Sequence, residues 1–523
     1  MDDPITFESI DISMSANLKD PVSVKSSDDY PFKILIMGDF SGRANRGLET
    51  DGADVENRRL YAVDRDCDDA VMEKIGVSVR IPSAGPSSPL VELGFNELED
   101  FHPEQIYYRS PLFKILKETR RKLLNPDTFA ETAARFSEKP LAAPHEEPVA
   151  STGKARKPQA VPGVTSSSDL LDQILEAGSG TPGDSGTAHP ATDWDRFLDD
   201  LVGPYLVPDI EKEQDALVGS VDRSIAGIMN SILHHHDFQA IEANWRALRF
   251  VIRRIDTGEN LQVYLLDLTR AELSASLTAC EDLADCAIAK KLAAAGQESS
   301  GQVPWSLIAG LYTFEKTKSD AVVLARAGAM GELLNAPFVA AADGSVIGCS
   351  NIAESPDPNG WTTRPPSEDE NAWQVVRSLP EAAWVGLAMP RFLVRLPYGE
   401  KTDPVDVFDF EEMPGDPPHD HYLWANPAFA VVLVLGRAFG RSGWALMQQL
   451  ETLVDGLPLH LFQRGDERLT KPCCEVLLTD RALSKMVTAG VMPLVSFKDQ
   501  DRAALARMQS IERSGKALSG RWS

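Results

Sequence analysis

A glycine-containing loop near the N-terminus has residue types that could bind a phosphate. Gly38-Asp-Phe-Ser-Gly-Arg43 follows a compact apolar stretch, and glycines at such a position let backbone N–H groups approach an anion. The loop has no Lys-Ser/Thr pair and no GxGxxG spacing, and the acidic Asp39 stands where the phosphate would lie. The sequence therefore favours a structural turn over a nucleotide site.

Two groups of histidines could ligate a metal ion. His234, His235 and His236 are adjacent, and imidazole suits zinc, copper or nickel. Adjacent side chains at a helix end point in different directions, and no HxxxH or HExxH spacing accompanies them, which favours helix capping or hydrogen bonding between helices. His419 and His421 follow a proline-rich loop without a nearby cluster of carboxylates or cysteines. We therefore predict no metal and no other cofactor.

The sequence carries no signature of a common hydrolase. It has neither a GxSxG elbow nor a cysteine with a matched histidine. The adjacent carboxylates Glu411-Glu412 and Asp199-Asp200 are more simply solvated surface in a chain with 78 Asp and Glu against 52 Lys and Arg. The resulting charge of −26 disfavours binding to nucleic acid or anionic lipid. We predict a protein that is not an enzyme.

Cysteine usage and hydropathy indicate the cellular compartment. The six cysteines have no CxxC spacing, in a chain too large to need disulfides. The first residues lack a basic region followed by an apolar run, and the longest apolar stretch, residues 429–435, is far shorter than a membrane span. These features predict a cytoplasmic protein without membrane insertion.

A shift in composition divides the 523 residues into two blocks. Residues 139–192 contain 7 Pro and 6 Gly and no aromatic residue, and such a segment cannot bury enough apolar surface to offset its ordering entropy. We predict a disordered linker there, between domains at residues 1–138 and 193–523, sizes typical of domains. No repeat at solenoid periods occurs.

Two short apolar patterns lie outside the expected cores. Within the linker, residues 168–176 place Leu170, Leu171, Ile174 and Leu175 on one stripe of a two-turn helix. A helix this short is marginal alone, so it is either a docking peptide that folds on a partner or a helix that packs on its own domain. Near the N-terminus, Ile10, Ile12 and Met14 alternate with polar residues, which predicts a detached strand that pairs with a sheet edge.

The remaining periodicity predicts a mixed α/β (α+β) fold. In the first domain we expect strands at 32–37, 77–81 and 91–95 and a helix at 111–124, with a small antiparallel sheet. In the second we expect one large mixed domain. Its helices are expected at 194–206, 211–233, 239–255, 273–295 and 319–334, its strands at 261–267, 305–311 and 336–342, and further elements at 410, 429–439, 475–478 and 494–497.

Motifs in the first domain resemble a known family. Lys33-Ile-Leu-Ile-Met-Gly-Asp-Phe-Ser-Gly-Arg43 and the later stretch Val91-Glu-Leu-Gly-Phe-Asn-Glu-Leu-Glu-Asp-Phe-His-Pro-Glu104 resemble the small sheath subunit of type VI secretion systems (TssB, VipA or ImpB). The resemblance covers about residues 5–136. Its motif residues include Gly38, Asp39, Phe40, Gly42 and Arg43.

The second domain resembles the large sheath subunit (TssC, VipB or ImpC), so that the chain is similar to a natural fusion of the two. Five motifs follow the family order across residues 166–500: residues 232–248, 336–342, 390–399, 422–428 and 475–481. Their motif residues are His234, His235, Asp237, Phe238, Trp245, Pro337, Phe338, Pro390, Arg391, Arg395, Pro397, Tyr398, Gly399, Tyr422, Trp424, Asn426, Asp480 and Arg481.

The resemblance implies a structural subunit of a contractile, phage-tail-like sheath. Such a sheath forms a helical polymer around a tube of haemolysin-coregulated protein (Hcp) on a baseplate, and its contraction propels the tube. Strands of neighbouring subunits share one sheet, a role that fits Ile10 to Met14. Leu170 to Leu175 is similar to the helix that a ClpV-type AAA+ unfoldase grips during recycling. No nucleotide is needed for contraction, because the energy is stored in the extended lattice.

Other interpretations stay open. The family's glycine-rich loop after Trp444 is replaced by residues 445–450, and little of the usual tail remains after Lys498. The chain is therefore either a sheath protomer or an accessory, non-contracting component such as a cap, initiator or adaptor that joins separate sheath subunits. A metal- or nucleotide-dependent enzyme and a monomeric adaptor for an unfoldase are the alternatives from other classes.

Overall fold

The computed structural model describes residues 30–82, 90–137, 210–298, 301–361, 367–415 and 418–522. We call residues 30–137 the N-terminal segment and residues 210–522 the C-terminal segment. The predicted strand at Ile10 to Met14, the linker with its helix at 168–176, and the predicted helix at 194–206 lie outside the described residues.

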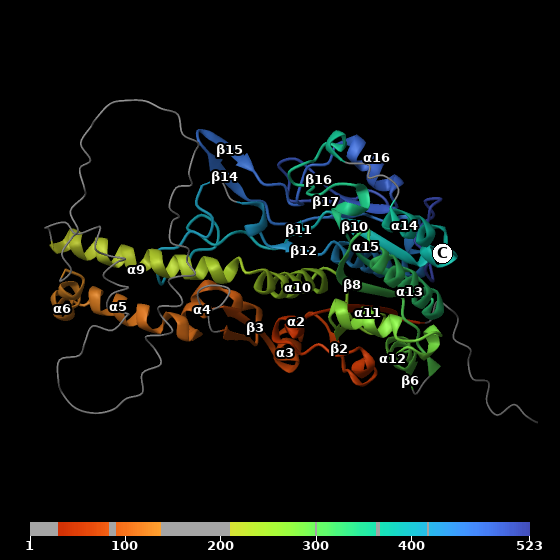
Figure 1. The fold of residues 1–523 in the computed structure, drawn as a ribbon, viewed down its shortest axis with the longest axis horizontal. Helices are drawn as coiled ribbons and strands as arrows, with labels where there is room; N and C mark the ends of the chain where they lie inside the picture. Colours follow the sequence, from red (N-terminus) through yellow and green to blue (C-terminus); the bar gives the residue numbers. More distant parts are fainter. Residues whose placement is uncertain are drawn as a thin grey trace, which may run out of the picture.

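One nine-stranded sheet contains strands from both segments (Figure 1). Its central strands run parallel, and antiparallel strands complete it at both edges. In spatial order the strands are β13 (Leu453–Val454), β17 (Ala503–Leu505), β16 (Val491–Ser496), β10 (Val385–Met389), β9 (Phe338–Ala342), β8 (Leu307–Phe314), β1 (Phe32–Gly38), β5 (Leu261–Asp267) and β2 (Leu60–Val63).

Strand β1 of the N-terminal segment lies inside this sheet, between two strands of the C-terminal segment. Phe32 pairs with Leu261 of β5, and Ile34 pairs with both Val263 of β5 and Leu307 of β8. Every residue of β1 is buried. A strand covered on both faces reads as a continuous apolar run, and this is why β1 shows no alternation of polar and apolar residues.

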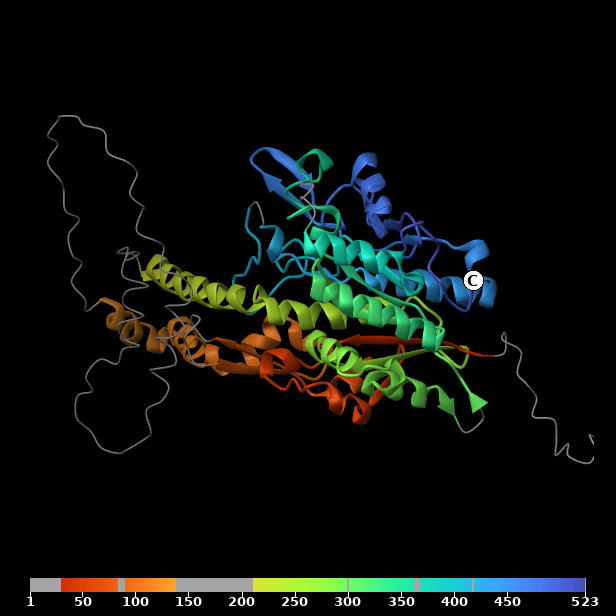
Figure 2. The same ribbon diagram turned by 45° about the vertical axis from the view of Figure 1, so that its right-hand side comes forward.

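The two faces of the sheet are covered by separate helical layers (Figures 1 and 2). Ile34 and Ile36 of β1 face the first core, whereas Leu35 and Met37 face the second. The first core contains α10 (His236–Ile252) and α15 (Ala428–Ser442). The second contains α11 (Arg270–Thr278), α12 (Ala287–Ala295), α13 (Lys318–Leu334), α14 (Glu368–Ser378) and α16 (Asp480–Thr488).

A helical extension projects from one end of the molecule (Figure 1). It consists of α5 (Lys114–Leu124) and α6 (Pro126–Ser137) of the N-terminal segment and α9 (Ile210–Leu233) of the C-terminal segment. Arg120 Nε and Nη2 donate to the carboxylate of Asp222 at 2.6 and 3.2 Å, a two-point contact that fixes α5 against α9. The two segments therefore pair along the extension as well as in the sheet.

Short elements complete the fold. The two-stranded antiparallel sheets are β3 (Val77–Pro82) with β4 (Leu90–Phe95), β6 (Gln297–Glu298) with β7 (Gly301–Gln302), β11 (Phe392–Leu393) with β12 (Trp424–Ala425), and β14 (Leu461–Arg464) with β15 (Glu467–Thr470). The remaining helices of the N-terminal segment are α2 (Arg43–Arg46), α3 (Asp68–Ile75) and α4 (Pro103–Arg109).

The mixed α/β class expected from the sequence is confirmed, and the structure adds that the two segments share one sheet. Three expectations were wrong in detail. No helix or strand forms at residue 410. The helix expected at 273–295 is two helices, α11 and α12, because Asp282 caps a short 3₁₀ turn that breaks the run. Residues 475–478 form no strand, and Val476 instead packs its side chain into the second core.

One helical stretch, Ala428–Gln449, is long and apolar enough to cross a membrane by length and composition. However, 61% of its most apolar window is buried inside the fold, and α15 packs against the central strands of the sheet. This burial is what a core helix of a layered α/β protein requires, because its apolar residues then face the sheet.

Candidate functional site: the interface between the two segments

The loop after β1 is held by the carboxylate of Asp39. Its Oδ1 accepts hydrogen bonds from the backbone N–H groups of Gly42 and Arg43, both at 2.7 Å, and its Oδ2 accepts one from Ala44 at 2.9 Å. Burial raises the pKa of Asp39 above its usual value. The N–H groups that would hold a phosphate in this loop are thus already bonded to a side chain of the loop itself.

Gly42 is required by the geometry of the same loop. Its φ of +80° lies in the left-handed region, and a Cβ there would stand 2.2 Å from the carbonyl oxygen of Ser78. The loop therefore packs directly on β3.

Asp267, at the carboxyl end of β5, joins the loop to the C-terminal segment. Its Oδ1 accepts from the backbone N–H groups of Phe40 and Ser41 at 2.9 and 3.1 Å, and its Oδ2 accepts from Ser41 Oγ at 2.7 Å. Because β1 and β5 are parallel, their carboxyl ends meet at one edge of the sheet, and this brings Asp267 to the loop.

Glu272 in α11 is fully buried and binds three residues of the N-terminal segment. Arg58 donates to both carboxylate oxygens, Arg43 Nη2 lies 3.2 Å from Oε1, and the backbone N–H of Thr50 donates to Oε1 at 2.9 Å. The two guanidinium groups and the N–H donors hold the pKa of Glu272 at about 2, below its usual 4.5, despite its burial. Glu272 is thus an ionised anchor between the segments.

Aromatic motif residues of both segments pack together in the first core. Trp245 Nε1 donates to the carbonyl of Phe40 at 2.9 Å, and the two rings meet edge to face with centroids 5.4 Å apart. Phe238 contacts the stacked rings of Phe95 and Phe101 edge to face. Such aromatic pairs add stability beyond the area that they bury.

A largely buried cluster of charged residues includes Glu242 and Arg246 of α10. Arg395 Nη1 and Nη2 donate to the two carboxylate oxygens of Glu412 at 2.7 and 3.0 Å, and its Nε donates to Glu242 Oε1 at 2.9 Å. Arg246 donates to the same Glu242 oxygen at 2.6 Å and to the hydroxyl of Tyr398 at 2.8 Å. The positive charge of Arg395 lowers the pKa of Glu412 to about 2.

The histidines at the α9–α10 junction have different surroundings. His234 stacks on His421 with ring centroids 3.8 Å apart, and its Nε2 lies 3.3 Å from Glu412 Oε1. Burial and the neighbouring His234 lower the pKa of His421. His235 precedes α10 as its N-cap residue but makes no side-chain capping hydrogen bond, so the capping role expected from the sequence was wrong for this residue. His236, the first residue of α10, is exposed, and Asp237 lies in the first turn of the helix.

The later motif residues stabilise the C-terminal segment. Arg391 binds Glu475 through Nη2 at 2.6 Å, and His419 Nε2 lies 3.2 Å from the same oxygen. The ring of Trp424 donates to the His419 carbonyl at 2.9 Å. Buried Tyr422 bonds His460 at 2.8 Å.

Other motif residues shape turns and helix starts. Asn426 Oδ1 accepts a hydrogen bond at 2.9 Å from the backbone N–H of Ala428, the first residue of α15. A Cβ on Gly399 would stand 2.2 Å from Glu411 Oε2. Phe338 starts β9 and lies in the second core, and the carbonyl oxygen of Pro337 accepts a hydrogen bond from the backbone N–H of Ile308. Pro390 follows β10 through a cis peptide bond, and the carbonyl oxygen of Pro397 accepts from the hydroxyl of Thr402. Asp480 and Arg481 begin α16.

A cavity of about 590 Å³ lies beside this interface. It opens at the carboxyl ends of β1, β5 and β8, where ligands of parallel α/β sheets commonly bind, and residues of both segments line it. Its side chains include Asp39, Asn45, Asp237, Asn244 and Arg270.

Sequence reasoning missed the acidic residues that join the segments. The spacing Thr269-x-x-Glu272 is the capping-box signature and does mark the start of α11, where both reciprocal bonds form. The contacts of Glu272 with Arg43 and Arg58 span more than 200 residues of sequence, and no local pattern could reveal them. The same holds for the contacts of Asp267 with Phe40 and Ser41.

Comparisons with known proteins match the two segments to two sheath families. Residues 10–139 match the family described as type VI secretion system, VipA, VC_A0107 or Hcp2, and residues 215–512 match VipB, described as EvpB/VC_A0108, tail sheath N-terminal domain. The type VI secretion system sheath protein TssC1 of Pseudomonas aeruginosa is 31% identical over 311 residues. That match covers 58% of this chain and 62% of TssC1, so the chain spans less than two thirds of the relative's length. The chain belongs to the type VI secretion sheath family, as a fusion of segments of the VipA (TssB) and VipB (TssC) kinds.

Proposed function

We propose that this chain is a structural protomer of a contractile type VI secretion sheath, which polymerises around the inner tube and contracts to propel it. The observation that carries the proposal is the position of β1, a VipA-type strand, between the VipB-type strands β5 and β8. One polypeptide therefore contains both kinds of sheath segment already assembled, with no catalytic step in its proposed function.

Several edges of the fold suit addition of a strand from a neighbouring copy. The hairpin of β14 and β15 is two-stranded, with Leu461 47% exposed, and β2 forms one edge of the large sheet. An isolated hairpin is marginally stable, and an unpaired edge offers backbone donors and acceptors. The strand predicted at Ile10 to Met14 is the segment that we propose to add there.

The proposed partners follow from this role. We propose that the sheath surrounds a tube of Hcp-type protein in the cytoplasm, starts on a baseplate, and is recycled after contraction by a ClpV-type unfoldase. Contraction would draw on a difference in packing between two lattice states.

Negative-stain electron microscopy tests the proposal. The full chain is imaged alone, with its tube protein, and with separate sheath subunits. We expect hollow tubules with a regular helical surface from the chain alone or with the tube. Dispersed monomers under all three conditions would contradict the assembly proposal.

Removing the predicted strand at Ile10 to Met14 is expected to stop polymerisation. Deleting residues 1–15, or changing Ile12→Pro, should leave folded monomers, because proline removes a backbone donor from the strand. The matched control is Ile12→Val, which keeps the β-branched side chain and should still form tubules. Sedimentation measures the fraction of protein in polymers. Normal pelleting of the proline variant would contradict the proposal that this strand joins neighbouring copies.

Changes in the predicted docking helix should affect recycling alone. Leu171→Asp with Ile174→Asp replaces apolar residues of the stripe, so binding to a ClpV-type unfoldase should weaken while tubules still form. Gln173→Asp adds a charge to the polar face and serves as the control. Unfoldase affinity is measured by fluorescence anisotropy, and equal affinities for the two variants would remove the docking role.

A second role within the same machine is an accessory, non-contracting component. It is favoured by the short 3₁₀ helix at residues 443–449, which stands where the resemblance places a glycine-rich loop. In the microscopy experiment, incorporation into tubules of separate sheath subunits without tubules from the chain alone would indicate this role.

A further inference from the structure

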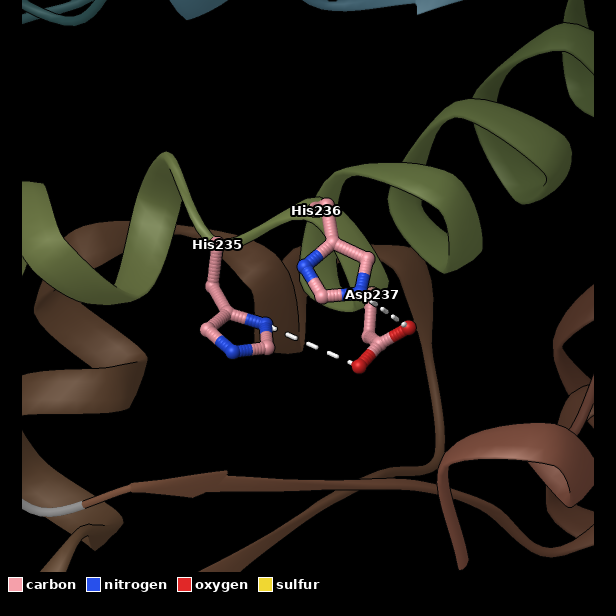
Figure 3. A group of neighbouring side chains, drawn as sticks. All are labelled: His235, His236 and Asp237. Carbon is pink, nitrogen blue, oxygen red and sulfur yellow. Dashed lines mark ion pairs between the residues drawn. The ribbon is translucent and has the colours of Figure 1, made fainter. Parts of the chain in front are cut away.

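Three potential metal ligands converge at the junction of α9 and α10. Figure 3 shows the side chains of His235 and His236 directed at the carboxylate of Asp237. His236 Nε2 lies 3.2 Å from Asp237 Oδ1, and His235 Nδ1 lies 3.9 Å from Oδ2. One ligand atom from each of the three residues lies within 4.8 Å of the others. Ligands about 2.0–2.2 Å from a tetrahedral zinc ion are separated by about 3.4 Å, so small side-chain rotations would close the site.

One nitrogen of this group of side chains has no hydrogen-bond partner in the part of the chain that the structure describes. His235 Nδ1 is a buried atom, and among the described residues it has no hydrogen-bond partner. A buried polar atom without a partner is costly, and a cation at this point would satisfy it. The N-cap position gives no alternative explanation, because His235 makes no capping bond with its side chain.

The carboxylate is oriented by a residue of the N-terminal segment. Asn45 Nδ2 donates to Asp237 Oδ2 at 2.7 Å, and Asn45 Oδ1 in turn accepts from the backbone N–H of Arg80 at 2.6 Å. This leaves Asp237 Oδ1 toward His236. Ligating carboxylates in metal sites have such outer partners, which fix their orientation and tune affinity.

The surroundings give a cation both access and attraction. Asn45 and Asp237 line the 590 Å³ cavity, and the side chain of His236 is 84% exposed to solvent. Among the described residues that line this cavity, Asp39, Glu49 and Asp237 are acidic and Arg270 is basic. The N-terminus of α10 opposes a cation, but a helix dipole changes affinity by only about two- to fivefold.

We propose that His235, His236 and Asp237 bind a divalent transition-metal ion of the zinc class, through two imidazole nitrogens and one carboxylate oxygen. This ligand set suits zinc and its neighbours in the first transition series. The proposed metal site at the junction of α9 and α10 does not depend on the proposed role in polymerisation.

The test uses the full chain without a polyhistidine tag. Zn²⁺ is titrated by isothermal calorimetry, and Co²⁺ is followed by its visible absorption, which reports coordination geometry. We expect one high-affinity site. Loss of an outer-shell partner costs about 10- to 100-fold in metal affinity, so Asn45→Ala should weaken Zn²⁺ binding by about 10-fold. His236→Gln and Asp237→Asn each remove a ligand and should weaken Zn²⁺ binding by more than about 100-fold. His460→Gln, at a buried histidine bonded to Tyr422, is the control for binding to other histidines and should leave Zn²⁺ affinity unchanged.

Circular dichroism of each variant without metal checks that the fold is kept. The proposal is overturned if the parent chain binds no stoichiometric Zn²⁺, or if His236→Gln and Asp237→Asn bind as tightly as the parent. His236 is exposed, so its replacement by glutamine keeps the fold and tests the ligand role by itself.

Discussion

Replacing Arg395 with methionine is expected to lower the free energy of unfolding by about 3–5 kcal/mol, the cost of leaving a buried charge without its partner. The side chain of Arg395 is 7% exposed, and both of its partners, Glu242 and Glu412, are fully buried. Methionine has a similar length and packs well, so the loss reports charge and hydrogen bonds more than volume.

The matched control is Arg80→Met. Arg80 pairs with Glu92 at 3.2 Å, but both side chains are more than 40% exposed, and an exposed pair contributes at most about 1 kcal/mol. Urea unfolding followed by tryptophan fluorescence measures both variants. Adding Glu412→Gln to Arg395→Met should recover part of the loss, because one uncompensated charge is removed. Equal losses for Arg395→Met and Arg80→Met would contradict a structural role for the cluster.

Replacing Glu272 with glutamine is expected to cost about 3 kcal/mol at pH 7, since the depression of its pKa from 4.5 to about 2 corresponds to that energy. The pKa of Glu272 is lower in the folded state than in the unfolded state, so folding favours the ionised carboxylate. Ionised Glu272 stabilises the fold fully above pH 4.5, and this contribution is lost as the pH falls toward 2. The difference between parent and variant should therefore shrink over that interval.

Thermal unfolding of both proteins between pH 7 and pH 3 measures this difference. Glu92→Gln is the control, because the Glu92 side chain is 49% exposed and its pair with Arg80 lies on the surface. A parent and a Glu272→Gln variant with parallel pH profiles would show that Glu272 is not the ionised anchor between Arg43 and Arg58.

The sequence was sufficient for elements with a strong local pattern. The largely apolar run of residues 32–37 predicted a strand, and the turn chemistry at residues 83–89 separates the two strands that form the β3–β4 hairpin. The motifs of both segments predicted the family that the comparisons support. In each case the signal lies within a few residues of chain.

Other features depend on contacts between distant residues. Nothing in residues 32–38 specifies that β1 pairs with β5 and β8, more than 200 residues further along the chain. The division into two helices at residues 279–286 depends on the cap at Asp282 and on burial of Cys286, whereas the periodicity continues across the break. Charge partners such as Arg395 and Glu242 are likewise brought together by packing alone.

The central position of β1 has a consequence for synthesis of the chain on the ribosome. Phe32 pairs with Leu261, and at 5–20 residues per second the partner strand emerges about 10–50 s after β1. During this interval an uncharged, β-prone stretch, Ile34 to Gly38, has no strand beside it. Slowing translation between residues 138 and 261 should therefore increase aggregation of nascent chains before it changes the finished fold.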